Sequence, residues 1–429
     1  MSYIVIIGGG FGGLYAARTL KSAPVQVTLI DRRNFHLFQP LLYQVATGWL
    51  SPADIASPLR AVLKRQRNVQ VLLAEALDID ITNRRVILKD GSVSYDTLIV
   101  ATGARHHYFG NAQWEQFAPG LKTIEDATEI RRRILSAFEA AERETDHAQV
   151  QSWLTFVIVG GGPTGVELAG TLGELAQDTL RHDFRHINPA ESRILLVEGA
   201  DRILPTYAAE LSAKATAALA RLGVSVHTGA TVTDVQPDAV IIRRNDQSEH
   251  IPTRTVLWAA GVQASPLGRI LATATGVELD RAGRVMVAPD LSIPNHPDIF
   301  VIGDLAHYRN QQGQSLPGVA PVAMQQGQYV AELIQQRLRG QTPPPFHYRD
   351  RGSMAIVGRA EAVADVRGRR FSGLLAWLAW LFIHLMNLVE FENRLLVVIQ
   401  WAWNYFTRNR SARLITGEPP SSTVVSVKQ

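Results

Sequence analysis

The sequence has no cysteine in its 429 residues. Disulfide bridges and thiolate zinc sites are therefore excluded, and so is the redox-active dithiol of disulfide reductases and sulfide oxidisers. The twelve histidines show no metal-binding spacing such as HExxH, so we predict no metal site. A whole set of thiol-based and metal-based chemistries is thereby removed.

We also predict no signal peptide. A strand-like run begins at Ile4, which leaves no room for a charged n-region and an apolar h-region, so we expect the protein to stay in the cytosol. Apolar residues make up 46% and charged residues 19%, as in a globular chain with cores for two or three domains.

The net positive charge of +4 lies in one segment. From Arg367 to Arg413 there are seven arginines and two glutamates, which leaves the rest of the chain about neutral. The segment also contains an uncharged run from Phe371 to Val389 and four of the eight tryptophans. This combination favours a membrane surface over a nucleic acid as the partner.

The uncharged run is barely long enough to cross a bilayer. Ser372 and His384 interrupt it, and the amphipathic helix predicted over 394–407 is too short to return. We predict a peripheral, monotopic anchor on the cytoplasmic face of the membrane, with a buried interface of a homodimer as the alternative. In the anchor, three arginines would meet anionic lipid headgroups: Arg408, Arg410 and Arg413.

Two glycine loops of the same kind follow apolar, strand-like runs. The glycines permit a tight turn from strand to helix, let the backbone approach a pyrophosphate, and leave the helix N-terminus facing its charge. One such loop is weak support, but two in one chain predict two bound dinucleotides. The loop glycines are Gly8, Gly10 and Gly13 in the first loop and Gly160, Gly162 and Gly165 in the second.

A carboxylate ends the strand that follows each loop. Asp31 is the last residue of VQVTLID. After a polar insertion from Arg181 to Ser192, the strand predicted in RILLVEG ends at Glu198. Carboxylates at these places bind the adenosine ribose, although a solvated carboxylate at a strand end is the plain alternative. Glu198 would also repel a 2′-phosphate, which favours NADH over NADPH.

These patterns predict an α/β fold with two Rossmann-like dinucleotide-binding domains and a C-terminal helical segment. The two nucleotide units look like a duplicated plan, because each closes with a strand followed by small residues. Prolines 343–345 mark a linker. The predicted parts are a first dinucleotide domain at 1–120 and 286–342, a helical connector at 121–152, a second dinucleotide domain at 153–285, a membrane-anchoring or dimerisation region at 346–416, and a flexible tail at 417–429.

The order of the motifs resembles the two-dinucleotide flavoproteins, and within them the type II NADH dehydrogenases, which are single-subunit, non-proton-pumping NADH:quinone oxidoreductases. The resemblance covers nearly the whole chain. The stretches that carry it are NFHLFQPLLYQVATG, GGGPTGVELAG, WAAGV, VIGDLA, GSMAIVGRAEAVAD and LAWLAWLFIHLMNLVEFENRLLVVIQWAWNYFTRNRSARLI.

The resemblance implies that the first loop binds FAD and the second NADH. It also implies a quinone as the acceptor and the start of the helix near Ala320 as a neighbour of the flavin. The implied FAD contacts are Gly8, Gly10, Gly13, Asp31, Thr102, Gly103, Asp304 and Ala320, and the implied NADH contacts are Gly160, Gly162, Gly165, Glu198 and Gly261.

Two residues are candidates for the chemistry. Glu167 occupies the position where the family places an acid near nicotinamide and flavin, although a carboxylate satisfied by backbone N–H groups is the alternative. The family's quinone motif Ala-Gln-x-Ala-x-Gln reads Ala320-Pro321-Val322-Ala323-Met324-Gln325 here, so only Gln325 keeps an amide. Two alternatives stay open. One is a soluble NAD(P)H reductase with a ferredoxin-like acceptor, whose sequence would lack the tryptophan-rich basic tail, and the other is a slow redox-sensing flavoprotein, which could tolerate the loss of the glutamine at 321.

Overall fold

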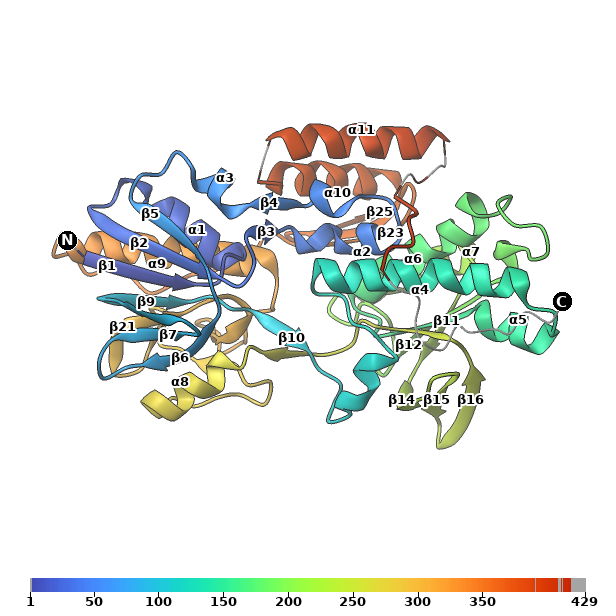
Figure 1. The fold of residues 1–429 in the computed structure, drawn as a ribbon, viewed down its shortest axis with the longest axis horizontal. Coiled ribbons are helices and arrows are strands. Elements are labelled where there is room, and N and C mark those ends of the chain that lie inside the picture. Colours follow the sequence, from blue (N-terminus) through green and yellow to red (C-terminus); the bar gives the residue numbers. More distant parts are fainter. Residues whose placement is uncertain (1, 390, 408–409, 411, 418–429) are drawn as a thin grey trace. The chain divides into compact units, whose positions relative to one another are not determined.

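The structure is a computed structural model that describes residues 2–389, 391–407, 410 and 412–417 (Figure 1). The chain divides into two compact units. The first consists of Met1–Leu37, Ala56–Arg105 and Val262–Arg351, and the second of Phe38–Ile55, His106–Gly261 and Gly352–Gln429.

The first unit is built on a six-stranded sheet with the order β20-β21-β9-β1-β2-β5. Three inner strands, β1, β9 and β21, contain continuous buried apolar runs, as expected for strands covered on both faces. Helices α1 (Phe11–Thr19) and α9 (Ala320–Leu338) pack side by side against one face (Figure 1). The strands are β1 (Ser2–Ile7), β2 (Val25–Asp31), β5 (Val69–Leu73), β9 (Thr97–Val100), β20 (Ser292–Ile293) and β21 (His296–Val301).

A small antiparallel sheet and helix α8 (Leu267–Thr275) complete the core on the other side of the large sheet. The other elements of the first unit are short helices and strands that connect the sheets and α9. These elements are β3 (Phe35–Leu37), β4 (Ala56–Pro58), α3 (Leu59–Leu63), β6 (Ala76–Asp80), β7 (Arg85–Leu88), β8 (Gly91–Ser94), β10 (Ala104–His106), β18 (Val262–Ala264), β19 (Val285–Met286), η7 (Gly303–Leu305) and β22 (Ala306–His307).

The second unit contains a four-stranded parallel sheet with the order β13-β12-β11-β17. Alternate side chains of its strands face opposite layers. Phe156 of β11 meets Phe138 of α4, whereas Val157 packs with the β14–β15–β16 sheet. The elements are α4 (Ile124–Arg143), α5 (His147–Trp153), β11 (Thr155–Val159), α6 (Pro163–Glu174), β12 (Arg193–Glu198), α7 (Ala209–Arg221), β13 (Val224–Thr228), β14 (Ala230–Val235), β15 (Ala239–Arg244), β16 (Gln247–Pro252) and β17 (Thr255–Trp258).

The C-terminal part of the second unit is a three-stranded antiparallel sheet followed by two helices, which Figure 1 draws in red. No helix in the described part of the chain is both long enough and apolar enough to traverse a bilayer. The elements are α2 (Leu42–Ala46), which packs nearby, β23 (Ser353–Gly358), β24 (Glu361–Val366), β25 (Arg369–Ser372), α10 (Leu374–Asn387) and α11 (Phe391–Thr407).

The compact units divide the chain at other positions than the predicted domain boundaries. Residues 262–285, predicted in the second dinucleotide domain, belong to the first unit because Leu267 and Leu271 lie in its core. Residues 38–55 and 106–120, predicted in the first, belong to the second unit, where α2 packs on α4 and α6. The predicted tail lies outside the described residues from 418 onward.

Candidate dinucleotide sites

The first glycine loop joins β1 to α1 in a turn that only glycine fits. Gly8 has a φ of 105°, and a Cβ there would lie 2.4 Å from the carbonyl oxygen of Ala101. A Cβ on Gly13 would lie 1.8 Å from the carbonyl oxygen of Gly8. Around Gly10, in contrast, a Cβ would meet nothing within 4 Å. The loop is therefore tight on its inner side and open where a ligand would approach.

The start of α1 suits an anion. Gly10 is its N-cap, no side chain caps it, and its first turn contains no acidic residue. Backbone N–H groups at such a helix start carry a partial positive charge. This position therefore has the properties that a pyrophosphate requires.

Asp31 closes the first loop from the end of β2. Its Oδ2 accepts a hydrogen bond of 2.5 Å from the Gly9 N–H, and its Oδ1 accepts one of 2.7 Å from the Arg33 N–H. Each carboxylate oxygen keeps a further lone pair for a ribose hydroxyl. The structure thus brings Asp31 to the loop, as the sequence predicts.

The turn after β9 lies beside the same loop. Gly103 has a φ of 65°, and Thr102 Oγ1 is shielded from solvent without a hydrogen-bond partner among the described residues. Because a buried hydroxyl without a partner is unfavourable, this atom fits a bound group that supplies one. The residues of this unit therefore fit a dinucleotide such as FAD.

Gly303-Asp304 lies at the start of η7, directly after β21. The Gly303 N–H donates to Oε1 of Gln326 over 2.7 Å, and a Cβ on Gly318 would lie 3.2 Å from Oδ1 of Asp304. Gln326 is a buried residue of α9 that sequence reasoning did not identify. A polar residue on the otherwise apolar inner face of that helix is the signal that could have found it.

Helix α9 begins at Ala320, with Pro321 in its first turn, as predicted. Gln325 does not project freely: its Nε2 donates to the Arg349 carbonyl over 3.1 Å, and its Oε1 accepts from the Arg349 N–H over 3.0 Å. This pairing ties α9 to the segment after the prolines. Contact between Gln325 and a quinone stays a prediction.

The second loop repeats the first in the other unit. Gly160 has a φ of 106°, and a Cβ on Gly165 would lie 1.8 Å from the Gly160 carbonyl oxygen. Gly162 is the uncapped N-cap of α6, where a Cβ would meet nothing within 4 Å. Glu198 Oε2 accepts from the Gly161 N–H over 2.5 Å, as Asp31 does in the first loop. Two equivalent dinucleotide sites result.

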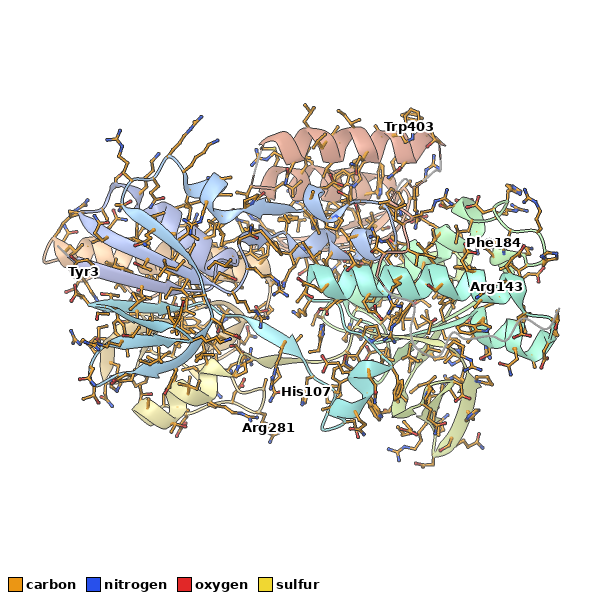
Figure 2. All side chains as sticks on the ribbon, viewed as in Figure 1. Tyr3, His107, Arg143, Phe184, Arg281 and Trp403 are labelled. Atoms are coloured by element: carbon orange, nitrogen blue, oxygen red, sulfur yellow. The ribbon has the colours of Figure 1, made fainter. Side chains whose placement is uncertain are left out.

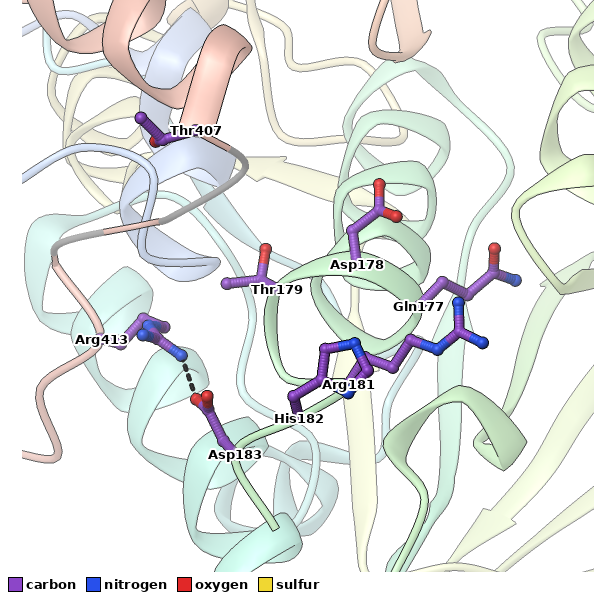
Figure 3. Close-up of a pocket in the computed structure, with 8 residues that line it drawn as sticks. All are labelled: Gln177, Asp178, Thr179, Arg181, His182, Asp183, Thr407 and Arg413. Carbon is purple, nitrogen blue, oxygen red and sulfur yellow. Dashed lines mark hydrogen bonds and ion pairs between the residues drawn. The ribbon is translucent and has the colours of Figure 1, made fainter.

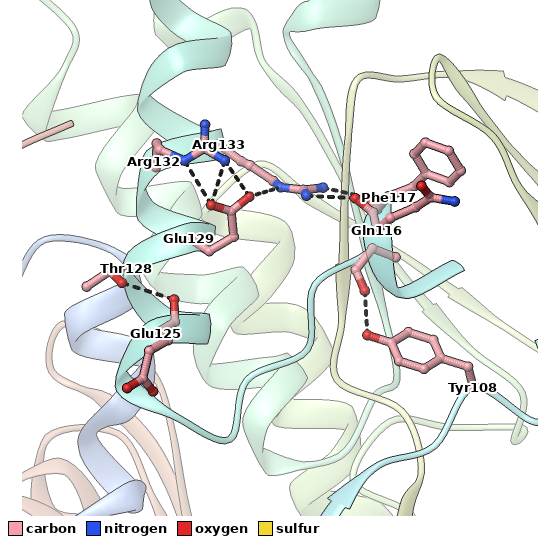
Figure 4. A network of polar contacts seen from close by, with 9 residues as sticks. Tyr108, Gln116, Phe117, Glu125, Thr128, Glu129, Arg132 and Arg133 are labelled. Atoms are coloured by element: carbon pink, nitrogen blue, oxygen red, sulfur yellow. Dashed lines mark hydrogen bonds and ion pairs between the residues drawn. The ribbon is translucent and has the colours of Figure 1, made fainter. Parts of the chain in front are cut away.

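Gly261 follows the last parallel strand of this unit. Its φ is 68°, and a Cβ would lie 2.7 Å from the ring of Phe109. The 108–118 segment that forms this wall is tied down by polar contacts: Tyr108 donates to the Ala118 carbonyl, and Arg133 of α4 donates to the Phe117 carbonyl (Figure 4). The wall beside Gly261 is thus fixed to α4.

Glu167 lies on α6, one turn beyond the loop, and is buried. Burial raises the pKa of this carboxyl well above 4.5, and a hydrogen bond from the backbone of Ile356 opposes the shift only in part. Burial and the charge of Glu167 also raise the pKa of the buried Tyr43 phenol well above 10.0. Burial therefore favours the protonated, neutral form of the Glu167 carboxyl.

A buried ion pair lies farther along α6, where the helix continues as a π-helical turn (Leu175–Thr179). Arg410 donates to Glu174 over 3.1 Å and to the Thr171 carbonyl over 2.9 Å, and Arg359 donates its N–H to the same carboxylate. Burial raises the pKa of Glu174 and lowers that of Arg410 to about 10. The pair anchors the chain after α11 to α6.

The predicted lipid contact of Arg410 is therefore wrong, because its guanidinium is buried in this ion pair. Arg413 forms an ion pair with Asp183, and Arg408 lies outside the described residues. The basic count in the sequence could not distinguish an arginine facing outward from one that a carboxylate draws inward.

A cavity of about 390 Å³ lies beside this anchor (Figure 3). Its walls are mostly polar and come from the π-helical turn after α6, the start of the polar insertion, the end of α11 and the chain after it. Arg413, predicted as a lipid contact, lines it, but none of the residues predicted to bind a cofactor or to serve the chemistry does. The lining residues are Gln177, Asp178, Thr179, Arg181, His182, Asp183, Thr407 and Arg413.

Comparison with known proteins agrees with this geometry. A family model described as pyridine nucleotide-disulphide oxidoreductase matches residues 2–327, and one described as NDH2 C-terminal domain matches residues 351–409. The chain therefore belongs to the pyridine nucleotide-disulphide oxidoreductase family, the class that its two glycine loops define.

Within that class, the chain belongs to the type II NADH:quinone oxidoreductases. It is 47% identical to two such enzymes of Mycobacterium tuberculosis, Ndh and NdhA. Each alignment covers 97% of this chain, with 90% of Ndh and 89% of NdhA. A solved structure of NDH2 from Plasmodium falciparum with NADH has a TM-score of 0.88 at 20% identity, over 97% of this chain and 100% of that one, which shows the shared fold.

Proposed function

We propose that this protein oxidises NADH and reduces a membrane quinone by way of bound FAD, without pumping protons. The observation that carries the proposal is the repeated loop, in which a strand-end carboxylate binds the middle glycine N–H in each unit. FAD, when bound in the first unit, would supply the chemistry of a hydride acceptor and two-electron carrier. The relatives of this protein that are named type II NADH:quinone oxidoreductases support the same reaction.

In this proposal the first unit binds FAD and the second binds NADH. Each uncapped helix start takes a pyrophosphate, and Asp31 and Glu198 accept hydrogen bonds from the adenosine riboses. Glu198 also disfavours the 2′-phosphate of NADPH. Thr102, Gly103, Asp304 and the start of α9 at Ala320 complete the FAD contacts, and Gly261 completes those of NADH.

Two side chains would serve the quinone half of the reaction. Burial raises the pKa of Glu167 and so favours its protonated form, which suits a proton donor to the reduced quinone. Gln325 would orient the quinone head once a ligand replaces its bonds to Arg349. Steady-state turnover of purified protein with NADH and a series of quinones tests the reaction, and absence of NADH-dependent quinone loss would overturn it.

We also propose that α10 and α11 lie on the surface of the cytoplasmic membrane leaflet. Their outer side chains are apolar and exposed: Phe382 is 65% exposed, Trp403 62% and Phe406 80%. Figure 2 shows Trp403 directed away from the body of its unit. The inner side of α11 keeps the polar Asn404, which donates to the Trp49 carbonyl. This arrangement suits an interfacial helix rather than a water-exposed one.

Flotation with anionic vesicles tests this placement. Replacing Phe382, Ile399 and Trp403 together by serine should release the protein from vesicles, because each loses apolar area worth about 2 kcal/mol on burial. Turnover with a water-soluble quinone analogue should persist. Leu73, which is 62% exposed on the first unit, provides a matched control as Leu73→Ser. If the triple variant changes only a dimer into a monomer, the helices form the homodimer interface instead.

A further inference from the structure

Both backbone polar groups of Gly9, the middle residue of the first glycine loop, have a side-chain partner. The Gly9 N–H donates to Asp31 over 2.5 Å, and the Gly9 carbonyl oxygen lies 3.0 Å from Nδ1 of His36. Since a carbonyl only accepts, Nδ1 must carry the proton in this contact. In a neutral ring the lone pair then sits on Nε2.

The contact with His36 determines where the next N–H points. Peptide groups are planar, and none in the described residues is cis, so the Gly9 C=O and the Gly10 N–H point in opposite directions. Binding the Gly9 oxygen on one side therefore aims the Gly10 N–H at the other. Gly10 is the uncapped start of α1, where the dinucleotide phosphates would lie.

The second loop satisfies the same carbonyl by a different donor. There the Gly161 oxygen accepts a hydrogen bond of 2.7 Å from the backbone N–H of Leu204. Both loops thus engage the equivalent oxygen, once by main chain and once by an imidazole. The recurrence indicates that the loop requires this bond. His36 provides the hydrogen-bond donor in the first unit, and the backbone N–H of Leu204 provides it in the second.

The surroundings of His36 favour the neutral ring and keep it in place. The residue is 1% exposed, and burial lowers its pKa to about 4. Phe11 packs edge-on against the ring at 5.0 Å, and strand β3 pairs His36 with Ser57 of β4. Its Nε2 is buried without a hydrogen-bond partner among the described residues. An apolar residue would avoid that desolvation cost, so the bond to Gly9 is what the histidine adds.

We propose that His36 is a positioning residue of the FAD site, which holds the Gly9–Gly10 peptide in the orientation that binds the cofactor's phosphates. The inference rests on the proposed binding of FAD by the first loop. It requires no contact between His36 and the reacting atoms.

The test measures FAD release from the holoenzyme by ultrafiltration and flavin fluorescence. His36→Leu removes the donor and should speed release about tenfold or more. His36→Asn places an amide N–H near the Nδ1 position and should stay within about threefold of the wild type. His36→Gln extends its amide toward the Nε2 position and should release FAD like the leucine variant, which keeps the test valid if the leucine variant fails to fold.

The matched control is His384→Leu in the second unit. His384 is another buried imidazole whose Nδ1 lies 2.8 Å from a carbonyl oxygen, that of Trp380, and its loss should leave FAD release unchanged. Release at the wild-type rate from His36→Leu, or equal release from the asparagine and leucine variants, would overturn the inference. If the wild-type protein itself holds no FAD, the proposed function fails instead.

Discussion

The two glycine loops of this protein are nearly the same, but the helices that follow them are not. The buried residues of α1 are Gly12, Gly13, Leu14, Ala16 and Ala17, all small or apolar. The buried residues of α6 include two carboxylates, Glu167 and Glu174. The loop chemistry therefore recurs, while the body of each helix is adapted to its own surroundings.

Those surroundings explain the difference. Helix α1 packs against α9 so closely that a Cβ on Gly327 would lie 2.2 Å from the Gly12 carbonyl oxygen, which leaves no space for long polar groups. Helix α6 packs against β23 and the chain after α11, which bring N–H groups and Arg410 to its carboxylates. Buried charge is tolerated only where such partners exist.

The largest effect is expected from adding a Cβ at the most crowded glycine of each loop, which tests whether the two loops are alike. Gly13→Ala places a Cβ against the Gly8 carbonyl oxygen, so we expect FAD binding to fall at least a thousandfold, about 4 kcal/mol. Gly165→Ala should do the same to NADH binding. Gly10→Ala serves as the control, because its Cβ meets no protein atom and apo stability should be kept. Cofactor titrations measure both effects, and tolerance of alanine at one loop alone would break the comparison.

The difference between the helices is tested at the buried ion pair. Arg410→Met leaves Glu174 without its cation and should lower the free energy of unfolding by about 3 kcal/mol. Adding Glu174→Gln should recover part of that loss. The exposed pair of Arg221 and Glu361 is the control, since Arg221→Met should cost less than about 1 kcal/mol in denaturant unfolding. Equal costs for the two arginine variants would contradict the assigned burial.

The pH dependence of stability tests the buried carboxyl group of Glu167 on α6. Its folded pKa is raised, so the folded state retains a proton that the unfolded state loses above about pH 4.5. The contribution of Glu167 to the free energy of unfolding is therefore greatest below pH 4.5. It falls by about 1.4 kcal/mol per pH unit as pH rises toward the folded pKa. Glu167→Gln should therefore gain on the wild type from pH 5 to 8 in thermal unfolding. A pH-independent difference would show that the carboxyl is ionised in the fold.

The smallest expected effect separates the two carboxylates that close the loops. Glu198→Gln should raise the KM for NADH about tenfold, near 1.4 kcal/mol, and weaken the preference over NADPH, while FAD stays bound. Asp31→Asn should instead speed FAD release and leave the KM for NADH unchanged. Steady-state kinetics and flavin release together distinguish them. The reverse pattern would exchange the cofactors assigned to the two units.

Local patterns in the sequence predicted the parts of the sites that lie close together in the chain. Asp31 and Glu198 end the strands as expected, and each accepts from the glycine N–H of its loop. The helical connector predicted at 121–152 contains α4, which buries one face with Ile130 and Phe138. These features follow from glycine geometry and from the 3.6-residue period, which need no knowledge of distant partners.

Other features depended on residues far apart in the chain. His36 reaches Gly9 through the pairing of β3 with β4, Gln326 reaches Gly303 from another helix, and Arg410 reaches Glu174 across most of the sequence. Gln326 has a local signal, because it is a polar residue on an otherwise apolar helix face. His36 and Arg410 have none, since an arginine in a basic segment looks the same in the sequence whether it is paired or solvated.

By itself, the sequence determined the two dinucleotide loops, their closing carboxylates and the apolar, tryptophan-rich C-terminal segment, since each depends on spacing within one stretch of chain. Only the tertiary structure decided which donor binds each loop carbonyl, which carboxyl groups have a raised pKa and which arginine is buried. These outcomes depend on desolvation and on partners that folding brings together, and both are properties of packing rather than of local pattern.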